Sequence, residues 1–254
     1  MLELQKFIQE HDSWAELLAA EPYNLKISYY GKLVMFKYNQ LTADFSIPLV
    51  REARGIILER KPPCRVVCWP FEKFFNYGEE YAAQIDWSTA SVQEKIDGSL
   101  MKCYFWDGEW RLATNGTINA YAAQIDGCTE FQTYGDLWDS IWPNWRKVMD
   151  MYGCPNFTYM FEMVSPYNKV VIPYQKSEIY FLGWRNCKTG EELPPEFSII
   201  SQYRPIPNRY PLNALGEVTA AANNLPWERE GYVVCHSQLK RVKTNSPIKK
   251  TKPT

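Results

Sequence analysis

A lysine stands between two extended runs of this chain, just ahead of a pair of residues that favours a turn. Lys95 follows the run 90–93, and Asp97-Gly98 comes shortly before the run 101–106. An amine held in such a loop can attack the α-phosphorus of a nucleoside triphosphate and carry the nucleotide as a phosphoramidate. A plain Asp-Gly turn after a solvated lysine would give the same local pattern, so the interpretation depends on the rest of the chain.

A lysine nucleophile needs charged neighbours. Its unperturbed pKa lies about three units above neutrality, so losing the proton costs on the order of 4 to 5 kcal/mol unless the surroundings lower that pKa. Phosphoryl transfer also needs Mg²⁺ held by carboxylates, and Lys or Arg side chains on the phosphate oxygens. The sequence must therefore supply both acids and further cations.

Two acidic residues stand where a carboxylate is unexpected. Glu162 and Glu230 each adjoin an apolar run with strand character, which suggests that they face a polar site. Taken alone, each is better explained as an exposed charge at a strand end, and Lys240 and Lys243 as solvated lysines. Only their combination with Lys95 points to catalysis.

Composition excludes several classes of function. The 254 residues, 46% of them hydrophobic, can bury a sizeable core in one large domain or two small ones. His11 and His236 are the only histidines, and the seven cysteines form no Cys-x-x-Cys pair, which disfavours a zinc site or a Ser/His/Asp triad. A net charge of −1 restricts any polyanion binding to a local surface. Without an apolar run of about 20 residues or a signal-peptide pattern, we expect a cytoplasmic protein with no membrane contact.

The elements that must position these residues alternate between helical and extended patterns. Helices are predicted over 3–20, over 117–152 with a break at Pro143, and over 215–224. Strands are predicted over 25–38 as a hairpin, then over 55–58, 65–69, 101–106, 109–113, 157–164, 169–173, 178–185, 231–235 and 239–244. This order predicts an α+β fold of mixed antiparallel sheets with peripheral helices. The Lys/Pro/Thr-rich tail 245–254 is predicted to be disordered.

The order of these residues along the chain resembles the covalent nucleotidyltransferase superfamily of ligases and capping enzymes. The closer resemblance is to the bacteriophage RNA ligase 1 family of ATP-dependent RNA ligases. It is carried by Ala53-Arg54-Gly55-Ile56, by the runs 71–76 and 95–100, and by the long run 161–171. The resemblance implies an antiparallel-sheet, ATP-grasp-like ligase adenylation domain over 1–244, in which residues 1–85 form an N-terminal portion and residues 86–244 the nucleotidyltransferase core.

The same resemblance implies roles for individual residues. Catalytic roles are implied for Lys95 as the lysyl-AMP, and for Glu162, Glu230, Lys240 and Lys243. Glu162 and Glu230 would contact the ribose and Mg²⁺ or Mn²⁺. Nucleotide-binding roles are implied for Arg54, Lys73, Phe75, Asp97, Gly98, Leu182, Gly231, Val233 and Arg241. Leu182 and Val233 would sandwich the adenine, and strand phase places Tyr180, Leu182 and Trp184 on one face. A core-packing role for Leu182 is equally compatible with the sequence.

The chain departs from the family pattern in three places. Asn115 stands where the family commonly has a lysine after the nucleophile hairpin. The last motif usually has two lysines two apart, so either Lys240 or Arg241 is the partner of Lys243. The sequence also ends soon after that motif, so we expect the family's tRNA-selecting C-terminal domain to be absent.

The resemblance predicts an ATP-dependent RNA ligase, acting as a monomer. Lys95 would take AMP from ATP and pass it to an RNA 5′-phosphate, and a 3′-hydroxyl would then displace AMP. Two alternatives stay open at this point. The chain could be another nucleotidyltransferase, a DNA ligase or a capping guanylyltransferase, or it could be an inactive RNA-binding homologue.

Overall fold

The computed structural model of the chain describes residues 1–168, 170–236 and 240–245. The helices are α1 Glu3–Glu10, α2 Trp14–Ala19, α3 Pro48–Glu52, α4 Tyr134–Ile141, α5 Trp145–Tyr152 and α6 Leu215–Asn223. The longer strands are β1 Leu25–Tyr30, β2 Leu33–Tyr38, β3 Arg54–Glu59, β6 Ser91–Glu94, β7 Ser99–Trp106, β8 Glu109–Thr114, β9 Phe157–Val164, β10 Glu178–Asn186, β13 Gly231–Cys235 and β14 Arg241–Asn245. Shorter strands are β4 Val66–Cys68, β5 Phe75–Asn76, β11 Glu192–Leu193 and β12 Arg209–Tyr210.

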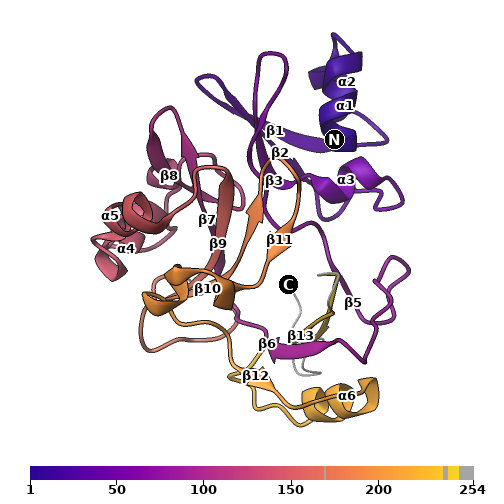
Figure 1. Ribbon diagram of the computed structural model, residues 1–254, viewed down its shortest axis with the longest axis vertical. Helices are drawn as coiled ribbons and strands as arrows, with labels where there is room; N and C mark the ends of the chain where they lie inside the picture. Colours follow the sequence, from indigo (N-terminus) through magenta and orange to yellow (C-terminus); the bar gives the residue numbers. More distant parts are fainter. Residues whose placement is uncertain (169, 237–239, 246–254) are drawn as a thin grey trace.

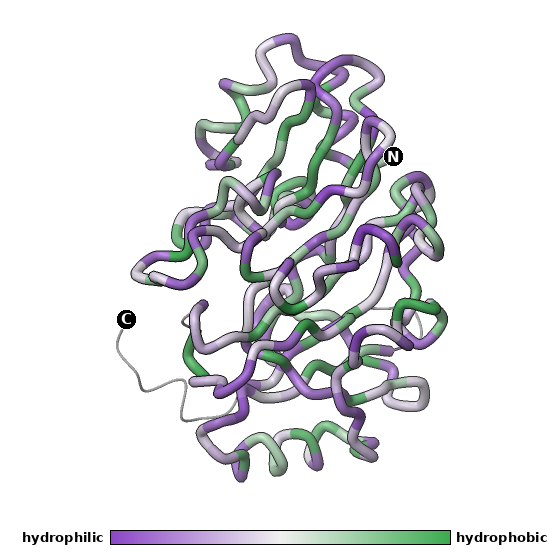
Figure 2. Tube along the Cα trace, turned by 90° about the vertical axis from the view of Figure 1, so that its left-hand side faces the viewer, coloured by the Kyte–Doolittle hydropathy of each residue, from purple (hydrophilic) through white to green (hydrophobic). Residues whose placement is uncertain are grey.

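These strands form three sheets, and the predicted α+β class is confirmed. The N-terminal sheet has the order β1-β2-β3-β4, the central sheet β11-β10-β9-β7-β8, and the lower sheet β12-β6-β13-β14-β5. Neighbouring strands are antiparallel except β5 and β14, which run parallel. In Figure 1, α4 and α5 lie beside the central sheet, and α6 lies below the lower sheet. Figure 2 shows the N-terminal sheet and α6 at opposite ends of the long axis.

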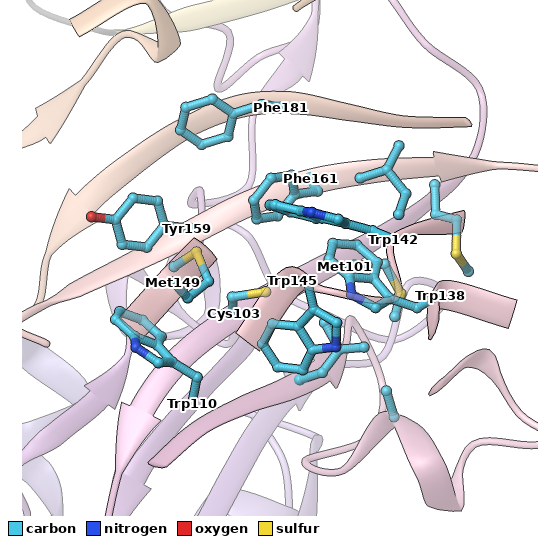
Figure 3. Packing of buried hydrophobic residues seen from close by; sticks show 14 of the residues in the cluster. Met101, Cys103, Trp110, Trp138, Trp142, Trp145, Met149, Tyr159, Phe161 and Phe181 are labelled. Carbon is cyan, nitrogen blue, oxygen red and sulfur yellow. The ribbon is translucent and has the colours of Figure 1, made fainter. Parts of the chain in front are cut away.

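A tryptophan-rich core covers one face of the central sheet. Trp138 of α4 and Trp145 of α5 are fully buried and pack with Phe161 of β9, as Figure 3 shows. Side chains alternate across a strand, so if Phe161 faces this core its neighbour Glu162 faces the opposite side. The helices therefore hold β9 with one carboxylate turned away from the core.

Alternation in the lower sheet has the same result. Val92, Val234 and Val242 pack with Val218 of α6 in a separate core. Their neighbours along each strand, such as Val233 beside Val234, point to the other face of the lower sheet, toward the central sheet. Two sheets, each covered by helices on its far side, thus present their other faces to a shared cleft.

The N-terminal sheet has a hydrophobic core of its own, formed with α1 and α2. Leu4 of α1, Leu18 of α2 and Phe36 of β2 are fully buried in one cluster.

The predicted break at Pro143 is confirmed, because α4 ends at Ile141 and α5 begins at Trp145. Among the described residues, no helix has the length and apolar character needed to cross a membrane.

Two expectations about strands are wrong. Residues 170–173 are not a strand, because Ile172 donates its backbone N–H to Asp97 Oδ2 at 2.9 Å and not to a neighbouring strand. A β-bulge in β10 between Phe181 and Gly183 changes the phase of the strand. Trp184 therefore packs in the tryptophan-rich core, and it does not share the face of Leu182. The predicted disordered tail lies outside the described residues, apart from Asn245 at the end of β14.

Candidate active site

The facing sides of the central and lower sheets enclose a cleft of about 720 Å³. Lys95 lines it directly after β6, where its backbone N–H donates to the Gly231 carbonyl at 3.0 Å. That bond continues the pairing of β6 with β13 by one residue. Gly231 therefore positions the lysine through its backbone carbonyl. No side chain fits at this glycine, because a Cβ would collide with the Thr244 carbonyl. The nucleophile candidate lies at the end of a fixed ladder.

Lys95 is held by an acid from a distant region of the chain. Its Nζ donates to Oε2 of Glu230, and the two side chains are only 19% and 11% exposed. Glu230 directly precedes β13, so the same strand positions both the backbone and the side chain of Lys95. A lysine and a carboxylate paired at this depth exclude the solvated-turn interpretation of Lys95.

Glu162 is the second acid of the cleft. Its Oε1 accepts the Gly98 backbone N–H at 3.1 Å, across from β9 to the loop after Lys95. Burial raises its pKa to about 7, against the lowering effect of the charges on Lys95 and Arg54, and Glu230 raises it further. The carboxylates of Glu162 and Glu230 thus repel each other beside the amine of Lys95. A bound cation would reduce this repulsion.

The loop 95–98 is fixed by the segment that sequence reasoning had made a strand. Asp97 Oδ2 accepts from Ile172, and Tyr174 Oη accepts the Asp97 backbone N–H at 3.3 Å. Gly98 has no room for a side chain, because a Cβ there would lie 2.5 Å from the Met163 carbonyl oxygen. Tyr174 was missed by sequence reasoning, and no local pattern marks a tyrosine that acts across 77 positions of sequence.

Three further cations surround the site. Arg54 lines the cleft and its guanidinium lies 4.9 Å from the centre of the Phe74 ring. Lys73 donates to Gln40 Oε1 at 3.3 Å, and burial together with the charges of Lys243 and Arg54 lowers its pKa to about 8. Burial and Lys95 likewise lower the pKa of Lys243. Cations that lower each other's pKa lie close together and are ready to receive a polyanion.

Strand phase separates Lys240 from Arg241. Arg241 and Lys243 are two apart in β14 and share its cleft side, whereas Lys240 is exposed and precedes the strand. Arg241 forms an ion pair with Glu192, which accepts from Arg185 at 2.7 Å. This buried group joins the lower sheet to the central sheet, and sequence reasoning missed Glu192 because nothing local distinguishes it from the exposed Glu191.

Leu182 and Val233 line the cleft from opposite sheets. Leu182 packs with Phe71, Leu100 and Met160, so its core-packing role is also present. Val233 is 8% exposed. Two apolar side chains from facing strands form a slot of the kind that accepts a flat aromatic ring.

Phe75 lies outside this cleft. It belongs to β5, packs against Phe45 with ring centres 5.5 Å apart, and borders a neighbouring cavity together with Lys73.

Asn115 does line the cleft, and its buried Oδ1 has no hydrogen-bond partner within the described ranges. Nearby, the fully buried Lys102 donates to the Gly55 carbonyl at 2.5 Å.

Glu162 and Glu230 are the two acids whose charges act together beside Lys95. The described ranges contain no group of three or more His, Cys, Asp or Glu side chains that could hold an ion. Glu162 and Glu230 fit Mg²⁺ as a carboxylate pair, since this ion usually takes one or two carboxylates and completes its shell with water and phosphate oxygens.

Comparison with known proteins places the chain in a family. A family model described as RNA ligase matches residues 52–248. A protein of Autographa californica nuclear polyhedrosis virus, provisionally named a bifunctional polynucleotide kinase/RNA ligase, is 28% identical over 91% of this chain and 34% of its own length. RNA ligase 1 of bacteriophage TS2126 is 31% identical over 59% of this chain and 38% of its own. The chain therefore spans little more than a third of each relative.

The fold agrees with that match. An archaeal ATP-dependent RNA ligase has a TM-score of 0.60 at 17% identity, covering 95% of this chain and 64% of that one. The span matched by the family model contains Arg54, Lys95, Glu162 and Glu230. The chain belongs to the RNA ligase family, of the phage RNA ligase 1 type.

Proposed function

We propose that this chain is an ATP-dependent RNA ligase that joins an RNA 5′-phosphate to a 3′-hydroxyl. The observation that carries the proposal is the buried Lys95–Glu230 pair, set beside Glu162 in a cleft whose apolar side chains Leu182 and Val233 face each other. An amine, two acids and an apolar slot in one cleft match the needs of nucleotidyl transfer from ATP.

In the first step, Lys95 Nζ attacks the α-phosphorus of ATP. The N–P bond forms, the bond to the β-phosphate oxygen breaks, and pyrophosphate leaves with that electron pair. The attacking amine must be neutral, and Glu230 Oε2, its hydrogen-bond partner, is in place to take the proton. Arg54, Lys73 and Lys243 supply positive charge for the departing pyrophosphate.

In the next two steps, the AMP is moved and then released. The RNA 5′-phosphate oxygen attacks the phosphorus of lysyl-AMP, which returns the amine to Lys95 and gives an adenylated RNA end. The 3′-hydroxyl of a second end then attacks the RNA phosphate, and AMP leaves. The first and third displacements transfer negative charge to a leaving oxygen, which the cations stabilise. In the second the P–N bond breaks, and the amine of Lys95 leaves and takes up a proton, for which Glu230 is its hydrogen-bond partner.

Glu162 and Glu230 would hold Mg²⁺ or Mn²⁺, which when bound neutralises phosphate charge. We propose that Leu182 and Val233 hold the adenine, and that Phe75 supports Lys73 from behind the phosphates. For the last motif we propose Arg241, on the cleft side of β14, as the partner of Lys243 in place of Lys240. Asp97 and Gly98 position the lysine loop through their contacts with Ile172 and Glu162.

The direct test is incubation of the full chain with ATP labelled at the α-phosphate and Mg²⁺, followed by denaturing electrophoresis. We expect the protein to retain label, Lys95→Ala to retain none, and a control variant of the exposed Lys147, Lys147→Ala, to be labelled normally. Label retained by Lys95→Ala would refute the nucleophile.

The labelling experiment also separates the rival functions. Label taken from GTP in preference to ATP would indicate a capping guanylyltransferase, and sealing of DNA ends only would indicate a DNA ligase. A chain that binds RNA but takes no label would be an inactive homologue.

We further propose that residues 1–244 act as one adenylyltransferase unit and that the protein works as a monomer. Its match to phage RNA ligase 1 supports a place of action in the cytoplasm of an infected cell.

A further inference from the structure

A second cavity of about 1100 Å³ opens beside the nucleotide cleft. The side chains that border both are Phe71, Phe74, Gln93, Leu182 and Arg241. The two cavities adjoin along these side chains, so a ligand whose reacting phosphate lies at Lys95 can extend into the second cavity. An RNA end attached to AMP is a ligand of that kind.

The wall of the second cavity combines cations with aromatic rings. The Arg51 guanidinium lies 5.9 Å from the centre of the Tyr81 ring, and the Lys73 ammonium 5.4 Å from that of Phe75. At the rim, Phe197 is 71% exposed, and Arg209 has a side chain that is 49% exposed. An exposed ring and cations on one cavity wall are features that bind single-stranded nucleic acid, through base stacking and phosphate contact.

Four acids border the second cavity, and two of them, Glu52 and Glu192, are engaged by the protein itself. Glu52 accepts the backbone N–H groups of Glu3 and Leu4, and burial raises its pKa to about 7, so it carries only a fraction of a charge at neutral pH. Glu192 is enclosed by Arg185 and Arg241. Glu72 and Glu191 are exposed, so an RNA strand would meet both signs of charge on this wall, with cations that include Arg51, Lys73 and Arg209.

We propose that the second cavity binds the RNA strand next to the end being joined, with a base stacked on Phe197 and a backbone phosphate held by Arg209. The inference rests on the proposed ligase function, because it uses the continuity of this cavity with the site of Lys95. Arg209 begins β12, which pairs with β6 just before the lysine, so the phosphate contact and the nucleophile are positioned by the same strand, β6.

The test uses three variants of the full chain and a fluorescein-labelled single-stranded RNA carrying a 5′-phosphate. Phe197→Ala removes the ring, Arg209→Ala removes the cation, and Glu196→Gln removes the acid that forms an ion pair with Arg209. The last two break the same ion pair but change the surface charge in opposite directions. Tyr29→Ala, an exposed ring on the N-terminal sheet, is the control.

We expect Phe197→Ala and Arg209→Ala each to weaken RNA binding about fivefold or more, while Glu196→Gln binds at least as tightly as the unaltered chain. Labelling by ATP should stay within about twofold for all three variants, while sealing of pre-adenylated RNA falls with RNA affinity. RNA affinity unchanged in the first two variants, or equally weakened in Glu196→Gln, would overturn the proposal. If the unaltered chain takes no label yet binds RNA in this variant-dependent way, the cavity assignment holds and the ligase proposal fails.

Discussion

Glu162 holds a carboxyl group whose pKa burial raises from 4.5 to about 7. Between these two values the folded chain keeps a proton that the unfolded chain has released. The free energy of unfolding therefore falls as the pH rises through this range, and the full cost is present above about pH 7. Binding of a cation beside Glu162 and Glu230 would offset that cost.

The pH dependence can be measured against Glu162→Gln, which keeps an oxygen to accept from Gly98. From pH 5 to pH 8 we expect the unaltered chain to lose up to about 3 kcal/mol of unfolding free energy relative to the variant, by urea denaturation without metal. Glu109→Gln, at an exposed residue, should run parallel to the unaltered chain. Parallel curves for Glu162→Gln would mean that Glu162 is ionised at no cost.

At the scale of residues, the sequence pointed to acids and lysines by type and spacing. Lys95, Glu162 and Glu230 could be singled out because a charge beside an apolar run is locally visible. Tyr174 and Glu192 could not, because their importance comes from contacts with Asp97 and Arg241 far away in the sequence.

At the scale of elements, β11 and β14 are joined by the buried group of Glu192, Arg185 and Arg241. Removing one partner of a buried ion pair leaves a charge without compensation, and that costs more than the pair contributes. The two sheets that form the cleft are therefore connected by a buried contact, and we expect a substitution in it to be destabilising.

Glu192→Gln should lower the free energy of unfolding by about 3 to 5 kcal/mol, because two buried guanidinium groups lose their shared carboxylate. The measurement is chemical denaturation, with the exposed neighbour in Glu191→Gln as the matched control, expected within about 0.5 kcal/mol of the unaltered chain. Equal stability of the two variants would show that the ion group contributes nothing to the fold.

Elements with a local signal were predictable. Asp107-Gly108 marks the turn between β7 and β8, and Pro143 ends one helix before the next begins. The β10 bulge and the loop at 170–173 have no such signal. Gly183 alone does not distinguish a bulge from a regular strand. The run that ends near Ile172 is apolar enough to be a strand, but the backbone N–H of Ile172 donates to Asp97 instead.

At the scale of the whole molecule, the cleft lies between two sheets, and the nucleotide that we propose for it would contact residues of both. A ligand that binds only the folded chain raises the free energy of unfolding by about 2.7 kcal/mol at a concentration of about one hundred times its Kd. Contact with both Leu182 and Val233 would tie the central sheet to the lower sheet.

An ATP analogue that cannot be cleaved between its α- and β-phosphates should therefore raise the Tm of the chain by about 5 to 10 °C near saturation. Leu182→Ser should retain less than half of that shift, because one wall of the adenine slot loses its apolar surface. Differential scanning fluorimetry measures both. An equal shift in the two proteins would place the base elsewhere.

The short strand β5 lies before residue 85 in sequence, yet it completes the lower sheet beside Lys243, with Asn76 opposite that lysine. A gene cut between codons 85 and 86 would thus encode two fragments, neither of which could finish that edge alone. We expect the fragments to regain self-labelling only when they are produced together. The recovered labelling would then measure how well β5 of one fragment pairs with β14 of the other.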